Sequence, residues 1–253
     1  MSEGQEYDIA LKKAQELGFA EADPSFDVDG LDASQKISII ASLAFDAKIM
    51  KQPLTEGITK ITKQDMEYAK ELGYVVKLLA IAKKQNSHIE LRTHPTMIPQ
   101  NHVFASINEE INAVLISGKQ VGNVLLSGKG AGKFPTASVV ITDVIEMGSR
   151  TRITERKFED IDIIDQGKIS SRYYLRLNVL DKPGVLAKIA KILGDNNISI
   201  AAVTQKEMNN EIVPIVILTH KALEENVSKA LQECKSSDVV KEEPILIRIE
   251  DLS

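Results

Sequence analysis

The sequence predicts an α+β protein of two parts, because the spacing of its apolar residues changes twice along the chain. Residues 1–72 repeat apolar side chains at helical spacing, and residues 74–127 carry β-rich runs separated by turn signals. From Arg172 onward the pattern gives strands and helices in the order βαββαβ. We therefore expect a mixed sheet with helices on one face over residues 1–150, a connector over 151–171, and a smaller domain over 172–253.

The elements of the first part are predicted from the spacing of apolar residues and from the turn-forming residues between them. Helical spacing predicts helices over about residues 5–17, 32–48 and 62–72. β-rich runs predict strands over residues 74–83, 88–97, 112–117 and 123–127, with a helix expected over 103–110. A last helix is predicted with Pro135 just inside its start and residues 136–147 running on from it.

The second part has a clearer pattern. Strands are predicted over residues 173–180, 198–207, 212–219 and 245–250, and helices over 185–193, ended by Gly194, and 222–235. This order is the ferredoxin-like βαββαβ layout.

The composition narrows the class of protein. The 253 residues include 31 Lys and Arg against 36 Asp and Glu, a net charge of −5, so no broad basic face for nucleic acid is expected. The single cysteine, Cys234, excludes an intramolecular disulfide framework and suits a reducing cytoplasm. No apolar run is long enough to span a membrane, and the polar start from Met1 to Asp8 is not a signal peptide. A cytoplasmic protein without nucleic-acid or membrane partners is expected.

The segment from Gly18 to Lys36 carries the strongest chemical signal. Five carboxylates fall within twelve residues, at Glu21, Asp23, Asp27, Asp29 and Asp32. Asp32 and Lys36 lie four residues apart and share a helix face. Such a loop suits a substrate with an ammonium group, and the lysine could pass a proton to a hydroxyl or carbonyl oxygen. Alternatively, Asp32 is an N-cap paired with a surface lysine, and the loop is simply solvated.

The residues of this segment resemble homoserine dehydrogenases. The resemblance rests on Gly18-Phe-Ala-Glu-Ala-Asp-Pro24, Asp27, Gly30-Leu-Asp32 and Lys36, and continues through Glu56-Gly-Ile-Thr-Lys60, His94-Pro95 and Gly128-Lys-Gly-Ala-Gly132. It covers roughly residues 1–150 with the motifs in the family's order. By this resemblance the substrates are L-homoserine and L-aspartate 4-semialdehyde, interconverted with NAD(P) in threonine and methionine biosynthesis.

The resemblance also assigns roles. It implies that Glu21 binds the substrate's amino group, that Asp32 contacts homoserine, and that Lys36 is the proton donor. Asp27 occupies a further acidic position that would orient Lys36 or the substrate. Gly18 and Gly132 match glycines that let the family's backbone approach the cofactor closely.

Two other motifs carry weaker signals. Residues 128–133 fail the Walker pattern, since Phe134 stands where Ser or Thr is needed, and they also miss Gly-x-Gly-x-x-Gly. His88, His94, His102 and His220 are scattered without metal-ligand spacing, so no metal site is expected, and His94 is interpreted as a structural residue at a strand end.

Residues 172–253 resemble an ACT domain, through the turn Asp181-Lys-Pro-Gly184, the following Val-Leu-x-x-Ile-Ala helix and the strand at Asn197-Ile-Ser-Ile. That family implies an amino-acid effector, threonine first among candidates, bound at Asp181, Pro183, Gly184 and Val185. Backbone amides at a helix start can receive a carboxylate. The alternative is an ACT fold used only for dimerisation.

A dinucleotide-binding strand–glycine turn–helix unit is not found in this sequence, so NAD(P) is expected to be bound mostly by a nucleotide-binding domain or subunit outside it. The chain is thus interpreted as the substrate and regulatory half of a homoserine dehydrogenase. A homodimer is expected, because both parts resemble domains that pair through sheets. The rival hypothesis is a stand-alone amino-acid sensor without catalysis.

Overall fold

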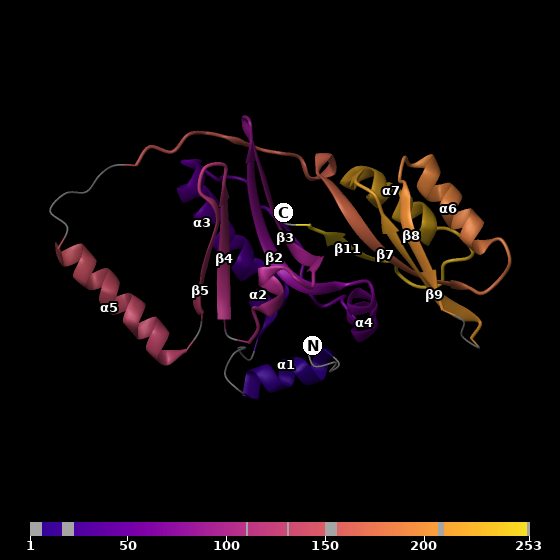
Figure 1. The fold of residues 1–253 in the computed structure, drawn as a ribbon, viewed down its shortest axis with the longest axis horizontal. Coiled ribbons are helices and arrows are strands. Elements are labelled where there is room, and N and C mark those ends of the chain that lie inside the picture. The colour runs from indigo at the N-terminus through magenta and orange to yellow at the C-terminus, as the bar shows by residue number, and fades with distance from the viewer. Residues whose placement is uncertain are drawn as a thin grey trace.

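The computed structural model describes residues 7–16, 23–109, 111–130, 132–149, 156–206 and 210–251. These residues form helices, a nine-stranded mixed sheet and a separate two-stranded sheet. Figure 1 shows an elongated molecule in which the helix-covered C-terminal strands and the N-terminal elements lie at opposite ends of the large sheet. The predicted α+β class with a mixed sheet is confirmed.

The N-terminal helices are α1 (Tyr7–Glu16), α2 (Ser25–Val28), α3 (Leu31–Phe45) and α4 (Lys63–Glu71). The short helix α2 lies inside the segment that was expected to be irregular. Helix α3 ends three residues before its predicted end, because Asp46 turns into the left-handed region at φ 51°. Helix α4 begins one residue after its predicted start, because Thr62 is its N-cap and forms a capping box with Asp65, in which each side chain accepts a hydrogen bond from the other's backbone amide.

Strands β2 (Tyr74–Gln85) and β3 (His88–Pro99) form a long antiparallel hairpin. Strand β2 is longer than predicted because Asn86 adopts a positive φ and the chain reverses over Asn86 and Ser87 alone. Strand β3 begins as predicted and runs two residues further, to Pro99. Helices α3 and α4 pack on one face of this hairpin. Leu91 shares a buried apolar cluster with Ala41 of α3, and Met97 shares another with Tyr68 of α4. Leu91 and Met97 have the same strand parity, so the predicted placement of helices on one face is confirmed.

The other edge of β3 is paired by three short parallel strands. They are β6 (Asp162–Ile163), β1 (Leu54–Thr55) and β11 (Ile245–Ile249), which meet β3 at residues 88–89, 92–93 and 96–97 in that order. Strand β11 comes from the C-terminal end of the chain, and the sequence did not indicate this pairing. It makes the C-terminal strands continuous with the N-terminal sheet.

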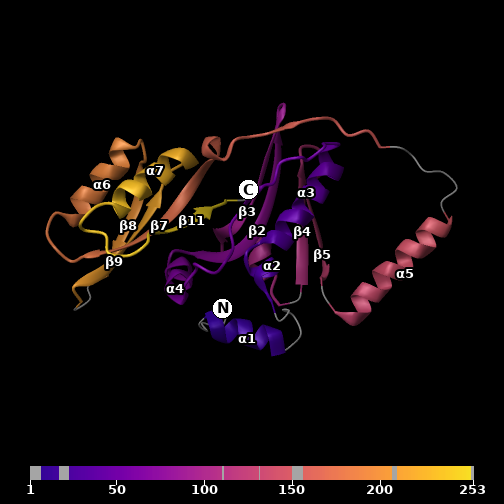
Figure 2. The same ribbon diagram turned by 180° about the vertical axis from the view of Figure 1, so that it is seen from behind.

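A hairpin of β4 (Ile111–Gly118) and β5 (Gly122–Lys129) follows the 3₁₀ turn η1 (Val103–Ser106), which is shorter than the helix expected there. Helix α5 (Lys133–Ser149) comes next and begins two residues before Pro135, earlier than predicted. Figure 2 shows α5 standing apart from the large sheet. No residue of α5 is buried.

The C-terminal strands are β7 (Ser170–Leu180), β8 (Ile200–Gln205), β9 (Ile212–Thr219) and β11, with the two-residue β10 (Ala222–Leu223) and the 3₁₀ turn η2 (Gln166–Lys168) beside them. The helices are α6 (Val185–Asp195), one residue past Gly194, and α7 (Glu224–Lys235). The sheet order β11-β7-β9-β8 confirms the ferredoxin-like βαββαβ layout. A core including Leu177, Ile189 and Val227 fills the space between this sheet and its two helices.

The opposite face of these strands packs against α4. Tyr68 and Ala69 of α4 share a buried cluster with Tyr174 of β7 and Ile247 of β11. Within it, Arg176 donates to Asp65 of α4 at 2.6 Å. Burial alone would raise the pKa of Asp65, but hydrogen bonds from Arg176 and Thr62 outweigh it and lower that pKa.

Candidate functional site

The described part of the acidic segment, from Asp23 to Lys36, presents its carboxylates and its lysine to solvent. Asp32 lies in the first turn of α3, and its carboxylate is 2.6 Å from the ammonium of Lys36 one turn later. The side chains remain 34% and 57% exposed, so both groups are available to a ligand. Asp27 is exposed in the preceding helix α2, and only Asp29 and Gly30 separate that helix from α3. The structure therefore gathers acids and one cation around a single turn.

Tight backbone contacts hold this turn in place. Gly30 adopts φ 79°, a conformation that favours glycine, and a side chain there would meet the carbonyl of Glu56 and the methyl of Thr93. The amide of Ile58 donates to the carbonyl of Val28 at 2.8 Å. A side chain at Gly57 would lie 2.3 Å from that carbonyl. The turn is thus fixed against residues 56–58.

Two predicted residues, Gly18 and Glu21, lie outside the described residues, so their positions relative to Lys36 stay predictions. Gly132 is described, with φ 117° immediately before α5. Gly130 in the same loop packs against the side-chain amide of Asn112, where a Cβ would clash at 1.9 Å. Among the described residues, no hydrogen bond or ion pair joins Gly132 to Asp27, Asp32 or Lys36.

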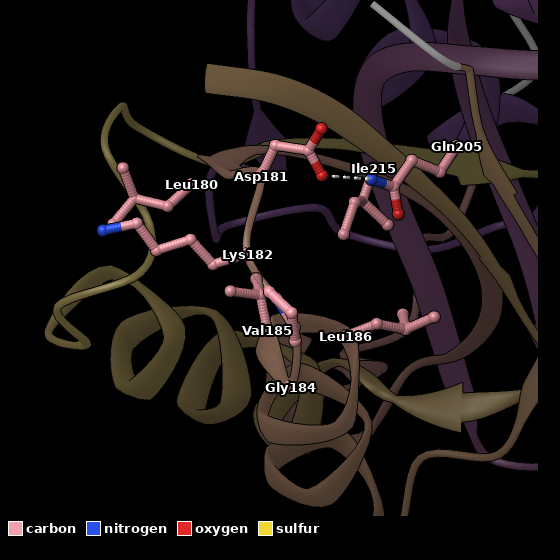
Figure 3. A pocket seen from close by; sticks show the side chains of 9 residues that line it. Leu180, Asp181, Lys182, Gly184, Val185, Leu186, Gln205 and Ile215 are labelled. Atoms are coloured by element: carbon pink, nitrogen blue, oxygen red, sulfur yellow. Dashed lines mark hydrogen bonds between the residues drawn. The ribbon is translucent and has the colours of Figure 1, made fainter. Parts of the chain in front are cut away.

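The four predicted effector residues share a pocket of about 320 Å³ at the start of α6. Gly184 is the N-cap of α6 with φ 88°, and Val185 begins the helix. Figure 3 shows Asp181 and Gln205 on one side of this pocket, joined by a hydrogen bond of 3.4 Å, and the first residues of α6 on the other. The site therefore opposes a carboxylate to a helix N-terminus, where amides lack intrahelical partners.

Sequence reasoning missed a buried charged cluster between the N-terminal and C-terminal strands. Arg248 of β11 is paired with Glu56, which follows β1, and with Glu224, which begins α7. Nearby, Arg92 of β3 is paired with Glu250. An arginine between isoleucines in a strand is typical of a solvent-facing position, but Arg248 is buried, in a strand paired with both β3 and β7.

His94 belongs to this buried region and lies within β3, not at the strand end where it was expected. Arg92 can only donate, so the Nε2 atom 2.7 Å away must accept, and the Nδ1 proton faces the carbonyl of Pro95. Burial, with the positive charges of Arg248 and Arg92, holds the pKa of His94 well below its usual value.

The described residues contain no group of three His, Cys, Asp or Glu side chains placed to hold a metal. None of the described helices has the length and apolarity to cross a bilayer.

Comparison with known proteins gives two family matches. The profile of the family described as homoserine dehydrogenase matches residues 1–145, and that of the ACT domain matches residues 173–236. A homoserine dehydrogenase of Pseudomonas aeruginosa is 38% identical over 99% of this chain and 61% of its own length. One of Helicobacter pylori is 42% identical over 96% of this chain and 59% of its own length.

A solved structure gives the same result. The crystal structure of a homoserine dehydrogenase from Thiobacillus denitrificans superposes with a TM-score of 0.90 at 40% sequence identity. The match covers all of this chain and 60% of that protein. The chain thus spans about three fifths of the length of the relatives that it matches.

Proposed function

This chain belongs to the homoserine dehydrogenase family and carries an ACT domain, and we propose that it supplies the substrate-binding and regulatory part of a homoserine dehydrogenase. The observation that carries the proposal is the solvent-facing turn with Asp27, Asp32 and Lys36. It offers negative charge for an ammonium group beside a cation able to exchange a proton, which homoserine oxidation requires.

In the proposed reaction L-homoserine and L-aspartate 4-semialdehyde are interconverted, and reduction of the semialdehyde to homoserine is the direction that leads toward threonine and methionine. Glu21 and Asp32 hold the substrate's amino group, and so keep the reacting hydroxyl close to the catalytic groups and correctly oriented. Lys36 exchanges the proton of the reacting hydroxyl, and Asp27 orients Lys36 or the substrate. The 2.6 Å contact between Asp32 and Lys36 supports this assignment, since it keeps the ammonium over the same turn.

Homoserine dehydrogenases use NAD(P), which accepts hydride from the alcohol carbon when bound. This sequence has no Gly-x-Gly-x-x-Gly, so the nucleotide end of the cofactor is assigned to another domain or subunit. The glycine loop before α5 fits the cofactor in one way only, by letting it approach the backbone closely. Gly132 has a positive φ, and Gly130 leaves no room for a side chain. We assign Gly132, with Gly18, to the nicotinamide end.

The partner that supplies the nucleotide-binding domain is proposed to cover α5. This helix exposes a run of large apolar side chains that a protein in water normally buries: Val139, Val140, Ile141, Val144, Ile145 and Met147. Each is between 57% and 76% exposed. Because α5 directly follows the glycine loop, a domain seated on it would bring its bound nucleotide next to Gly132.

We further propose a homodimer through the β4–β5 hairpin. This sheet has only two strands and is not hydrogen-bonded to the large sheet. Two-stranded sheets are marginally stable alone, and Val124, Leu126 and Ile116 are at least 41% exposed on it. A second copy offers the same surface and can cover it.

The ACT pocket is proposed to bind an amino-acid effector, with threonine as the first candidate. A zwitterion fits the observed polarity, because the first amides of α6 can receive its carboxylate and Asp181 its ammonium group. The pocket volume of about 320 Å³ lies at the small end of ligand sites, as an amino acid requires.

The test is homoserine-dependent NAD(P)H formation by the purified 253-residue chain, alone and mixed with the nucleotide-binding domain of one of the relatives. Activity in the mixture, absent from each part alone, is expected. No activity in either case, with threonine still bound by the chain, would favour the stand-alone sensor.

A further inference from the structure

The buried cluster around Arg248 lies where the ACT strands join the N-terminal sheet. Strands β1 and β11 are successive neighbours along one edge of β3, and Figure 2 shows β11 between β3 and β7. Glu56 continues from β1, with its amide donating to the carbonyl of Thr93 at 2.9 Å. Arg248 of β11 is therefore brought beside Glu56, although 192 residues separate them in sequence.

Arg248 makes a bidentate contact with each of the two carboxylates, those of Glu56 and Glu224. Its Nη1 and Nη2 atoms donate to the two oxygens of Glu56 at 2.8 and 2.9 Å. Its Nε donates to Glu224 at 2.9 Å, and its Nη2 contacts the other oxygen of Glu224. Arg248 and Glu224 are only 2% and 5% exposed, whereas Glu56 is 41% exposed. The guanidinium thus fixes a half-exposed N-terminal carboxylate from a buried position on the ACT sheet.

Glu56 is connected to the acidic turn by short backbone steps. Residues 57 and 58 press against the backbone of Val28 and Asp29 and donate one hydrogen bond to it. The carbonyl of Glu56 itself lies against Gly30, the N-cap of α3. One residue before, the hydroxyl of Thr55 donates to Ser34, which lies in α3 between Asp32 and Lys36.

We infer that Arg248 is a positioning residue, which holds Glu56 and through it the turn that presents Asp32 and Lys36. This rests on the proposed function, since it assumes that this turn binds substrate. It gives the ACT domain a direct connection to the substrate site, because the same guanidinium holds the first residue of α7. A shift of β11 or α7 would move Glu56 and change the placement of the two site residues.

The test compares backbone amide hydrogen exchange of the full 253-residue chain in four forms: wild type, Glu56→Gln, Arg248→Lys and Arg176→Lys. Arg176 is the matched control, because it is a buried arginine of the same sheet whose carboxylate partner, Asp65, lies on α4 and not near the turn. Amides 27–36 should exchange roughly tenfold faster in the Glu56 and Arg248 variants. They should keep the wild-type rate in Arg176→Lys. Glu56→Gln is half-exposed and preserves side-chain shape, so it remains informative if Arg248→Lys folds poorly.

Ligand binding supplies a second readout that a general loss of stability would not give. The sequence has no tryptophan, so Phe26→Trp, on the exposed side of α2, provides a fluorescent reporter beside the turn. In this background Glu56→Gln should weaken L-homoserine binding roughly tenfold and leave threonine binding to the ACT pocket unchanged.

Unchanged exchange at residues 27–36 in both Glu56→Gln and Arg248→Lys overturns the inference, even if homoserine binds. Equal acceleration in Arg176→Lys also overturns it, because the effect would then be general. A chain that binds no homoserine but shows the selective exchange response supports the connection and contradicts the proposed substrate instead.

Discussion

Two groupings of carboxylate and cation in this molecule serve opposite purposes. Asp32 and Lys36 pair at 2.6 Å on a helix surface, with both side chains at least one-third exposed. Arg248 pairs with Glu224 in the interior, where the two side chains are only 2% and 5% exposed, and the same guanidinium also holds the half-exposed Glu56. The contrast shows that the distance between two charged groups does not indicate whether the pair serves binding or structure. Water access separates a pair that can exchange partners with a substrate from one that can only hold elements together.

The energetic consequences of this difference follow from solvation. An exposed pair at i, i+4 gains little from the attraction, because water solvates each partner nearly as well. A buried pair has already lost its hydration, so removing one partner leaves an uncompensated charge. The first arrangement can be altered at little cost to folding, and the second cannot.

The largest expected effect is on the buried cluster. Arg248→Met should lower the free energy of unfolding by about 3–5 kcal/mol, because Glu224 would remain buried without its partner. Urea titration followed by circular dichroism measures this. Lys191→Met, which removes a surface ion pair with Asp195 whose side chains are 74% and 60% exposed, is the control and should change the free energy little.

A second substitution sharpens this prediction. Glu224→Gln added to Arg248→Met should recover part of the lost stability, because the buried negative charge is then gone. If the single and double variants are equally destabilised, the loss comes from packing and not from an unpaired charge.

The next largest effect is expected on catalysis. Lys36→Ala should reduce kcat roughly a hundredfold in the chain assembled with a nucleotide-binding domain, as is usual when an acid–base group is lost. Its urea midpoint should stay close to the wild-type value, since the lysine is 57% exposed. A normal kcat would remove Lys36 from the mechanism, and a large loss of stability would contradict the surface role of the pair.

The region around Arg248 should also make stability depend on pH. The pKa of His94 is low in the folded protein because of burial and two arginines, whereas the unfolded chain has the ordinary value near 6.5. Below about pH 6.5 the unfolded state therefore binds more protons, and the free energy of unfolding falls by up to about 1.4 kcal/mol per pH unit. Urea titrations at pH 5.0, 6.0 and 7.0 measure the slope.

His94→Gln is the matched variant for this slope, because it keeps a polar side chain that does not titrate. The free energy of unfolding should then be nearly flat between pH 5.0 and 7.0. A slope that persists would assign the dependence to another group.

Most elements of the fold could be predicted because their signals are local. The capping box at Thr62 and the amphipathic helix after Gly184 lie within a few residues of the structures they specify. The order βαββαβ follows from these local patterns. The β3–β11 pairing could not be found in this way, because it depends on strands that are more than 140 residues apart and on only two paired positions.

The same distinction between local and long-range signals applies to the candidate site. Asp32, Lys36 and the pocket at Gly184 were predicted from short motifs, and the structure brings each of these sets together. The connection from Arg248 to the acidic turn was not predicted, since Glu56 and Arg248 are both typical solvent-facing residues in their own sequence neighbourhoods. The roles of all the predicted site residues stay predictions, and Glu21 and Gly18 also lie outside the described residues.

The smallest expected effect concerns the exposed pair itself. Asp32→Asn should change the free energy of unfolding by only about 0.3–0.5 kcal/mol, as for other i, i+4 helix pairs. The amide retains the size of the side chain, so the substitution removes the charge without changing the volume. Guanidinium chloride would screen the pair, so urea at low salt is the appropriate denaturant. A loss above about 2 kcal/mol would mean that Asp32 has a buried structural role, comparable with that of Glu224. The contrast between the exposed pair and the buried cluster would then no longer hold, because Asp32 would also be needed for folding.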